Sequence, residues 1–181
     1  MSLEGTAFKL IKKYFMPTSY VEDFTKITPA RLNQLDVKSV IIDLDNTLVG
    51  YDEMNANDRV LEWVRLMKEN GIKVTIVSNG KKKRVRQFAK PHDIDYIFNA
   101  RKPLSKNYKK AISSTGVSKN ETVMVGDQLL TDIFGANLIG IKSILVVPVK
   151  NRDGYATLLN RRIERFIMRY FRKKGLLVKE D

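Results

Sequence analysis

The sequence has no cysteine, a single histidine and no long apolar run. Without cysteine the chain can form neither a disulfide nor a zinc–thiolate site, and it has no thiol nucleophile. The lone His92 is expected to be structural. No apolar run approaches the roughly 20 residues of a membrane-spanning helix, and nothing resembles a signal peptide. We therefore expect a cytoplasmic protein that is soluble or attaches peripherally to the inner membrane face.

Acidic residues are also scarce, with 20 Asp and Glu against 33 Lys and Arg and a formal net charge of +13. The excess is concentrated in two zones. Residues 81–110 hold eleven basic residues against two acidic ones, and residues 150–181 hold ten against four. Two such zones favour a polyanionic partner, which could be a phosphorylated substrate, a membrane surface or nucleic acid. The alternative is a solvated surface that keeps the protein in solution.

The 181 residues, 43% of them hydrophobic, are enough for one domain with a full core, so we expect residues 1–181 to form a single domain. Short Val- and Ile-rich segments alternate with segments of helical periodicity, which predicts a mostly parallel α/β sheet with helices on both faces. The expected strands are 38–43, 73–78, 95–98, 122–126 and 143–147. The expected helices are 57–70, 81–90, 104–115 and 129–138, and Thr28-Pro29 is typical of a further helix start.

Polar residues follow several of the expected strands. Asp43 and Asp45 end the first, Ser78-Asn79 ends the second, and Asp127 follows the fourth, with Asp132 soon after. Two acids two positions apart in a strand point the same way and repel each other unless a cation or a reaction partner holds them. Because ligands of parallel sheets bind at the carboxyl ends of the strands, these residues and Lys102 predict a site for phosphate and a divalent metal.

Phosphomonoester hydrolysis needs these residue types. Oxygen ligands suit Mg²⁺, which would offset the charge of the carboxylates and of the phosphate dianion. Asp43 can attack phosphorus, and Asp45 can protonate the leaving alkoxide and then deprotonate water. Ser78 and neighbouring amides would bind phosphoryl oxygens, and Lys102 would neutralise charge in the transition state. Each element alone also has a structural explanation, as turn, cap or surface residue, but their joint occurrence at strand ends favours the site.

Four elements resemble, in order and spacing, the signature of the haloacid dehalogenase superfamily. They are DLDNT at 43–47, Ser78-Asn79, Lys102-Pro103, and Gly126-Asp127 with Asp132. The resemblance implies a three-layer Rossmann-like α/β/α core at about 38–150, with an N-terminal arm at 1–37. It implies that Asp43 is the aspartyl-phosphate nucleophile, that Asp45 is the general acid/base, and that Ser78, Asn79 and Lys102 bind the phosphoryl group. The implied Mg²⁺ ligands are Asp43, the Asp45 backbone carbonyl and Asp127, while Thr47 and Asp132 support the site and Asp132 orients a metal-bound water or the lysine.

The gaps between the motifs are too short for the lid domains of many superfamily members. Only 34 residues separate Asp43 from Ser78, and 23 separate Ser78 from Lys102. The chain most resembles the capless subclass IIIA and, within it, the YqeG-type group, which is related to phosphatidylglycerophosphate phosphatases. The segments that carry this resemblance are Ile27-Thr28-Pro29, Arg101-Lys102-Pro103 and the GDQLLTDIFGAN run from Gly126. The resemblance to capless members implies a substrate that is too large, or too closely bound to a membrane, to be enclosed by a lid.

The pattern of residues 155–174 predicts a basic amphipathic helix. Its expected apolar stripe comprises Leu159, Ile163, Phe166, Ile167, Tyr170 and Phe171. Its cations are expected opposite that stripe: Arg161, Arg162, Arg165, Arg169, Arg172 and Lys173. Such a helix can lie in an anionic membrane interface, or it can pack its stripe on the sheet.

Three hypotheses follow. The first is a Mg²⁺-dependent phosphatase of phosphatidylglycerophosphate, with Lys81, Lys82, Lys83 and Arg84 receiving the anionic headgroup. The second keeps the enzyme but assigns it a soluble, protein or polynucleotide phosphomonoester. The third is a non-catalytic nucleic-acid-binding module, which the net charge alone permits.

Overall fold

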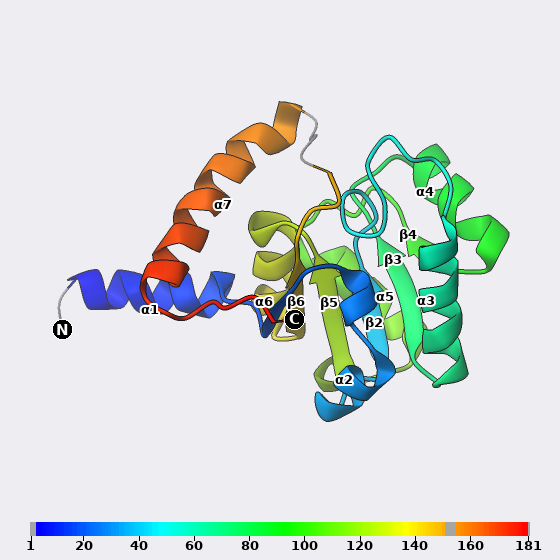
Figure 1. Cartoon of the computed structure of the whole chain (residues 1–181), viewed down its shortest axis with the longest axis horizontal. Coiled ribbons are helices and arrows are strands. Elements are labelled where there is room, and N and C mark those ends of the chain that lie inside the picture. The colour runs from blue at the N-terminus through cyan, green and yellow to red at the C-terminus, as the bar shows by residue number, and fades with distance from the viewer. Residues whose placement is uncertain (1–2, 151–154, 181) are drawn as a thin grey trace.

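The computed structural model describes residues 3–150 and 155–180, and its centre is one parallel sheet (Figure 1). The six strands lie in the order β1-β6-β5-β2-β3-β4, and every pair of neighbours is parallel. The strands are β1 Ser19–Val21, β2 Ser39–Ile42, β3 Lys73–Val77, β4 Asp95–Ile97, β5 Thr122–Gly126 and β6 Lys142–Val146. The helices are α1 Leu3–Phe15, α2 Pro29–Gln34, α3 Asp58–Glu69, α4 Lys82–Ala89, α5 Ser105–Thr115, α6 Phe134–Ile139 and α7 Tyr155–Lys173.

Capping residues mark the helix starts that the sequence predicts. The side chain of Thr28 accepts a hydrogen bond from the Arg31 amide at 3.2 Å, with Pro29 in the first turn of α2. Asn57 caps α3 in the same way, accepting from the Val60 amide at 3.1 Å. These local hydrogen bonds satisfy amides that have no partner within the helix, so each helix begins where its cap stands.

Successive side chains of each strand point to opposite faces of the sheet, and both faces are buried, as in other parallel sheets. Val40 and Ile42 pack into a cluster with Trp63 of α3, whereas Ile41 between them packs against Tyr108 of α5. Helices therefore cover both faces, and the expected three-layer α/β/α architecture is confirmed. Two segments were not expected. Strand β1 is a three-residue edge strand, and the expected helix at 129–138 begins as a π-helical turn over Leu129–Ile133, which continues into α6.

The terminal helices α1 and α7 lie on the β1–β6 side of the molecule, away from α3 and α4 (Figure 1). Helix α7 buries Ile167 and Phe171 in a third cluster with Tyr20 and Leu145. The expected apolar stripe is only partly correct, because Phe166 is 70% exposed and Ile163 is 45% exposed. The side chain of Leu159 lies outside the described part of the chain. Across residues 3–150 and 155–180, no helix combines the length and apolar character needed to cross a membrane.

Candidate active site

Three buried carboxylates meet at the carboxyl ends of β2 and β5. Asp43 directly follows β2 and Asp127 directly follows β5, the strand beside it, while Asp132 lies in the π-helical turn. One oxygen from each of the three carboxylates lies within 4.8 Å of the others. Uncompensated acids at this spacing repel each other, and hard oxygen ligands are those that Mg²⁺ prefers. The donor set therefore fits a divalent cation.

Lys102 joins two of these acids. Its Nζ donates to Asp43 Oδ1 at 2.6 Å and to Asp132 Oδ1 at 2.7 Å, and its side chain is only 2% exposed. Burial disfavours the charged amine, but the neighbouring Asp132 and Asp43 outweigh burial and raise the pKa of Lys102. The ammonium therefore stays charged next to the predicted nucleophile.

The backbone after β5 makes room for Asp132. A Cβ atom on Gly126 would lie 2.3 Å from the Asp132 carboxyl carbon, so any other residue there would push this side chain away from Lys102. Asp132 Oδ2 also accepts a hydrogen bond from the Gln128 amide at 3.1 Å. Glycine at the end of this strand is therefore a requirement of the site, because the carboxylate packs directly on the backbone.

Asp45 has a different environment from Asp43. Its Oδ1 accepts hydrogen bonds from Arg84 Nη2 at 2.9 Å and from Arg84 Nε at 3.2 Å. Burial and the nearby Asp43 charge raise the pKa of Asp45, and Arg84 only partly opposes that rise. A carboxyl group with a raised pKa can carry a proton for a leaving group. Arg84 thus lies at the site itself, whereas Lys81, Lys82 and Lys83 are exposed.

The remaining predicted residues surround this centre. Ser78 accepts a hydrogen bond from the Gly80 amide at 2.9 Å, and Thr47 donates to Asp127 Oδ1 at 3.2 Å. Asn79 accepts from the Lys102 amide at 2.8 Å, so its contact here positions the lysine loop. A cavity of about 280 Å³ is lined by Asp43, Asp45, Ser78, Asn79 and Lys102, among others. Within the described residues, no domain is inserted after β2 or β3 to cover it.

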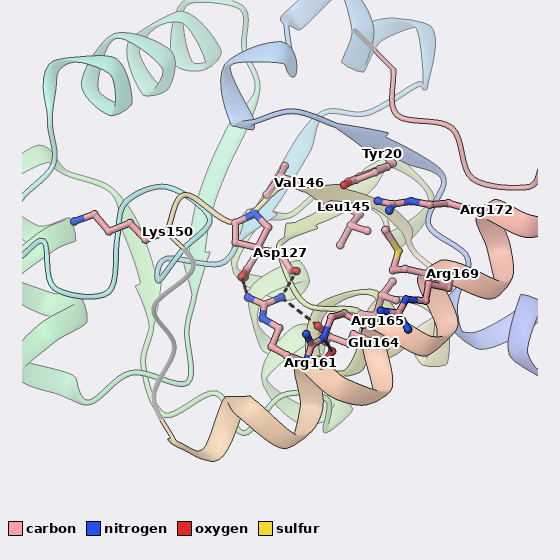
Figure 2. A pocket seen from close by; sticks show the side chains of 13 residues that line it. Tyr20, Asp127, Leu145, Val146, Lys150, Arg161, Glu164, Arg165, Arg169 and Arg172 are labelled. Atoms are coloured by element: carbon pink, nitrogen blue, oxygen red, sulfur yellow. Dashed lines mark hydrogen bonds and ion pairs between the residues drawn. The ribbon is translucent and has the colours of Figure 1, made fainter.

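Besides the contact of Arg84 with Asp45, a second charged contact at the site was not predicted. Arg161 of α7 donates to the Asp127 carbonyl oxygen at 2.8 Å and forms an ion pair with its carboxylate (Figure 2). The expectation that the cations of α7 lie opposite its packed face is therefore wrong for Arg161, and also for three further arginines that line a cavity beside β6. Burial raises the pKa of Asp127 to about 8, with Arg161 opposing and Asp132 and Asp43 adding to the rise. The two residues lie 34 positions apart, and no local sequence pattern links them.

Comparisons with known proteins agree with this geometry. Residues 11–146 match the model of the haloacid dehalogenase-like hydrolase family. The chain is 45% identical over 172 residues to the probable phosphatase YqeG of Bacillus subtilis (strain 168), covering 95% of this chain and all of that protein. It is 32% identical over 120 residues to glyceraldehyde 3-phosphate phosphatase of Pyrococcus abyssi, covering 60% of this chain and 48% of that protein.

A crystal structure of an uncharacterized protein from Listeria monocytogenes serotype 4b shares the fold, with a TM-score of 0.51 and 18% identity. The alignment covers 74% of this chain and 99% of that one. The family match and the YqeG relative confirm the expectation of a phosphatase of the haloacid dehalogenase type. The chain belongs to the haloacid dehalogenase-like hydrolase family.

Proposed function

We propose that the protein is a Mg²⁺-dependent phosphatase that forms a phosphoenzyme on Asp43 and removes the terminal phosphate of phosphatidylglycerophosphate. The observation that carries the catalytic part is the placement of Asp43. Lys102 holds its Oδ1 at 2.6 Å, and no described residue donates a hydrogen bond to its other oxygen. That second oxygen is thus available to attack phosphorus at the mouth of the site.

The metal would be held by Asp43, Asp127 and the backbone carbonyl of Asp45. When bound, Mg²⁺ would offset the negative charge of the carboxylates and of the phosphate dianion. Lys102 contributes a further fixed positive charge beside Asp43, and Asp132 and the Asn79 contact to the Lys102 amide keep it in place. A preorganised charge of this kind stabilises the transition state without reorganisation during the reaction.

In the first half-reaction an Asp43 oxygen forms a bond to phosphorus while the bond between phosphorus and the ester oxygen breaks. The leaving alkoxide takes its proton from Asp45, whose raised pKa favours the protonated form. In the second half-reaction Asp45, now ionised, removes a proton from water as the water attacks phosphorus. Asp43 leaves as a carboxylate, inorganic phosphate is released, and Asp45 is again protonated.

The lipid substrate is supported by the open site and by the surface beside it. Because the described chain has no inserted lid, a large or membrane-bound phosphomonoester can reach Asp43. The exposed Ile163 and Phe166 of α7 stand among basic side chains, as does the exposed Leu10 of α1. Apolar side chains surrounded by cations suit an anionic membrane interface, where each cation contributes about 1 kcal/mol. We therefore place the protein in the cytoplasm, in peripheral contact with the inner face of the membrane.

A phosphate-release panel tests this function. Wild type and Asp43→Asn are assayed with phosphatidylglycerophosphate, a nucleotide, glyceraldehyde 3-phosphate and a phosphopeptide, each with Mg²⁺ or with EDTA. We expect Mg²⁺-dependent release from the lipid by wild type and none by the variant. Preferred release from a soluble or peptide phosphomonoester would reject the lipid substrate but retain the enzyme. No release above the variant from any substrate would reject the catalytic proposal.

A further inference from the structure

A second, larger cavity adjoins the candidate active site. It has a volume of about 610 Å³ and lies between α7 and the carboxyl ends of β1 and β6 (Figure 2). Asp127 lines it, and the same carboxylate belongs to the acidic cluster with Asp43. The cavity therefore lies beside the acidic cluster, with Asp127 and its partner Arg161 between them. Its volume falls within the roughly 300–1,000 Å³ range of small-molecule sites.

One wall of this cavity is basic. Arg165, Arg169 and Arg172 line it from α7, at a spacing that places them along one side of the helix (Figure 2). Among the residues that the structure describes, none of the three pairs with a carboxylate. The other cations of the lining are already engaged, because Arg161 pairs with Asp127 and Glu164, and Lys150 pairs with Asp52 and Glu53.

The opposite wall is apolar. It is formed by side chains from β1, β6 and the π-helical turn: Tyr20, Leu129, Leu145 and Val146. Met168 adds an apolar side chain from α7 itself. An elongated ligand that fits both walls must carry an anionic group and an apolar body. Three guanidinium groups suit a phosphate in particular, because their planar donors bind its oxygens in pairs.

We propose that this cavity binds the phosphodiester group of an anionic glycerophospholipid. Arg165, Arg169 and Arg172 contact the diester oxygens, and the apolar wall receives the glycerol backbone and the first carbons of the acyl chains. This inference rests on the proposed function, because a lipid bound in this way points its terminal phosphomonoester past Asp127 toward Asp43. The three arginines are then specificity-determining residues that take no part in the chemical steps.

The lining favours a lipid over a nucleic acid. Single-stranded nucleic acids bind on exposed aromatic rings as well as on cations, because the bases stack there. Tyr20 is the one aromatic residue among those that line this cavity, so successive bases would have a single ring on which to stack. The exposed Phe166 and Ile163 lie on the same helix as the arginines, where they suit insertion between acyl chains.

Binding of a soluble product analogue tests the site without relying on hydrolysis. Titration calorimetry with monomeric dihexanoyl phosphatidylglycerol compares the wild-type protein with Arg169→Gln/Arg172→Gln. The matched control is Arg162→Gln/Lys173→Gln, which removes the same charge from exposed positions of α7 that do not line the cavity. We expect the dissociation constant to rise at least about tenfold in the first variant and to stay within about twofold of wild type in the control.

Three outcomes would overturn the site: unchanged binding in Arg169→Gln/Arg172→Gln, equal weakening in both variants, or tighter binding of a hexathymidylate without terminal phosphates than of the lipid. Failure of the site and failure of the proposed function remain distinguishable. Arginine-dependent binding by a protein that releases no phosphate from phosphatidylglycerophosphate would support the site and reject the function. Phosphate release from that lipid with unchanged binding in Arg169→Gln/Arg172→Gln would support the function and reject the site.

Discussion

The carboxylate cluster and the arginine wall of α7 are both strongly charged, but they are built in opposite ways. In the cluster, Lys102 is almost fully buried and contacts Asp43 and Asp132 at 2.6 and 2.7 Å. On α7, Arg165, Arg169 and Arg172 are exposed, and no described carboxylate pairs with them. The cluster follows central strands of the sheet, whereas the arginine wall belongs to the terminal helix α7. This helix contacts the cluster through Arg161, which pairs with Asp127.

This difference separates two tasks. Charges that are paired and buried before substrate arrives are preorganised for chemistry, because they do not have to rearrange during the reaction. Unpaired charges on an exposed helix gain most from a partner supplied by the ligand. The comparison therefore predicts that changes in the cluster alter the chemical steps for every substrate, while changes on α7 alter the choice of substrate.

The largest effect that separates the two regions is expected from Asp45→Asn. Loss of the general acid/base should slow turnover of an alkyl phosphate by about 10²–10⁴-fold. p-Nitrophenyl phosphate has a leaving group that needs little protonation. With this substrate, the variant should therefore slow the first half-reaction less than the second. A burst of about one p-nitrophenolate per enzyme, followed by slow turnover, should appear in stopped-flow absorbance. Equal slowing of both substrates without a burst would contradict the role of Asp45.

Removal of Lys102 tests whether the cluster is held together by buried pairing. Lys102→Gln leaves Asp43 and Asp132 without their cation, and the free energy of unfolding without metal should fall by about 3–5 kcal/mol. Arg84→Gln breaks a more exposed pair with Asp45, whose side chain is 30% exposed, and should cost about 1 kcal/mol or less. Urea unfolding measures both values. Similar losses in the two variants would show that burial does not distinguish these pairs.

The stability of the folded protein should depend on pH and on bound metal through the carboxylate cluster. Burial raises the pKa of Asp127 to about 8 and that of Asp132 to about 6, above the ordinary value of 3.8. From the ordinary pKa up to these raised values, the folded protein therefore binds more protons than the unfolded protein. The metal-free protein should therefore lose stability as pH rises through this range. Mg²⁺ binds the ionised carboxylates, so its stabilising effect should grow over the same range.

Thermal unfolding with EDTA or excess Mg²⁺ at pH 5.5 and 8 measures this coupling. At about 100 times the dissociation constant, Mg²⁺ should raise the melting temperature by roughly 5–10 °C at pH 8. The increase should be smaller at pH 5.5 and absent in Asp127→Asn. An equal increase at both pH values would place the metal elsewhere.

The catalytic centre was accessible from the sequence because its residues follow buried strands. Asp43 and Asp127 end Val- and Ile-rich segments, and the carboxyl ends of neighbouring parallel strands meet at one edge. Strand β1 was missed because its three residues are too few to show a period. The contact of Arg161 with Asp127 depends on the angle at which α7 packs, as does the exposure of Phe166. A helical pattern identifies an apolar face but does not show which part of it the sheet covers.

The most direct test of the separation between chemistry and substrate choice is a ratio of specificities. kcat/KM is measured for phosphatidylglycerophosphate in neutral detergent micelles and for p-nitrophenyl phosphate, using wild type, Arg169→Gln/Arg172→Gln and Arg162→Gln/Lys173→Gln. We predict that the first variant loses about tenfold on the lipid and keeps its activity on the small substrate, while the control keeps both. Equal loss on both substrates, or no loss on the lipid, would contradict the account.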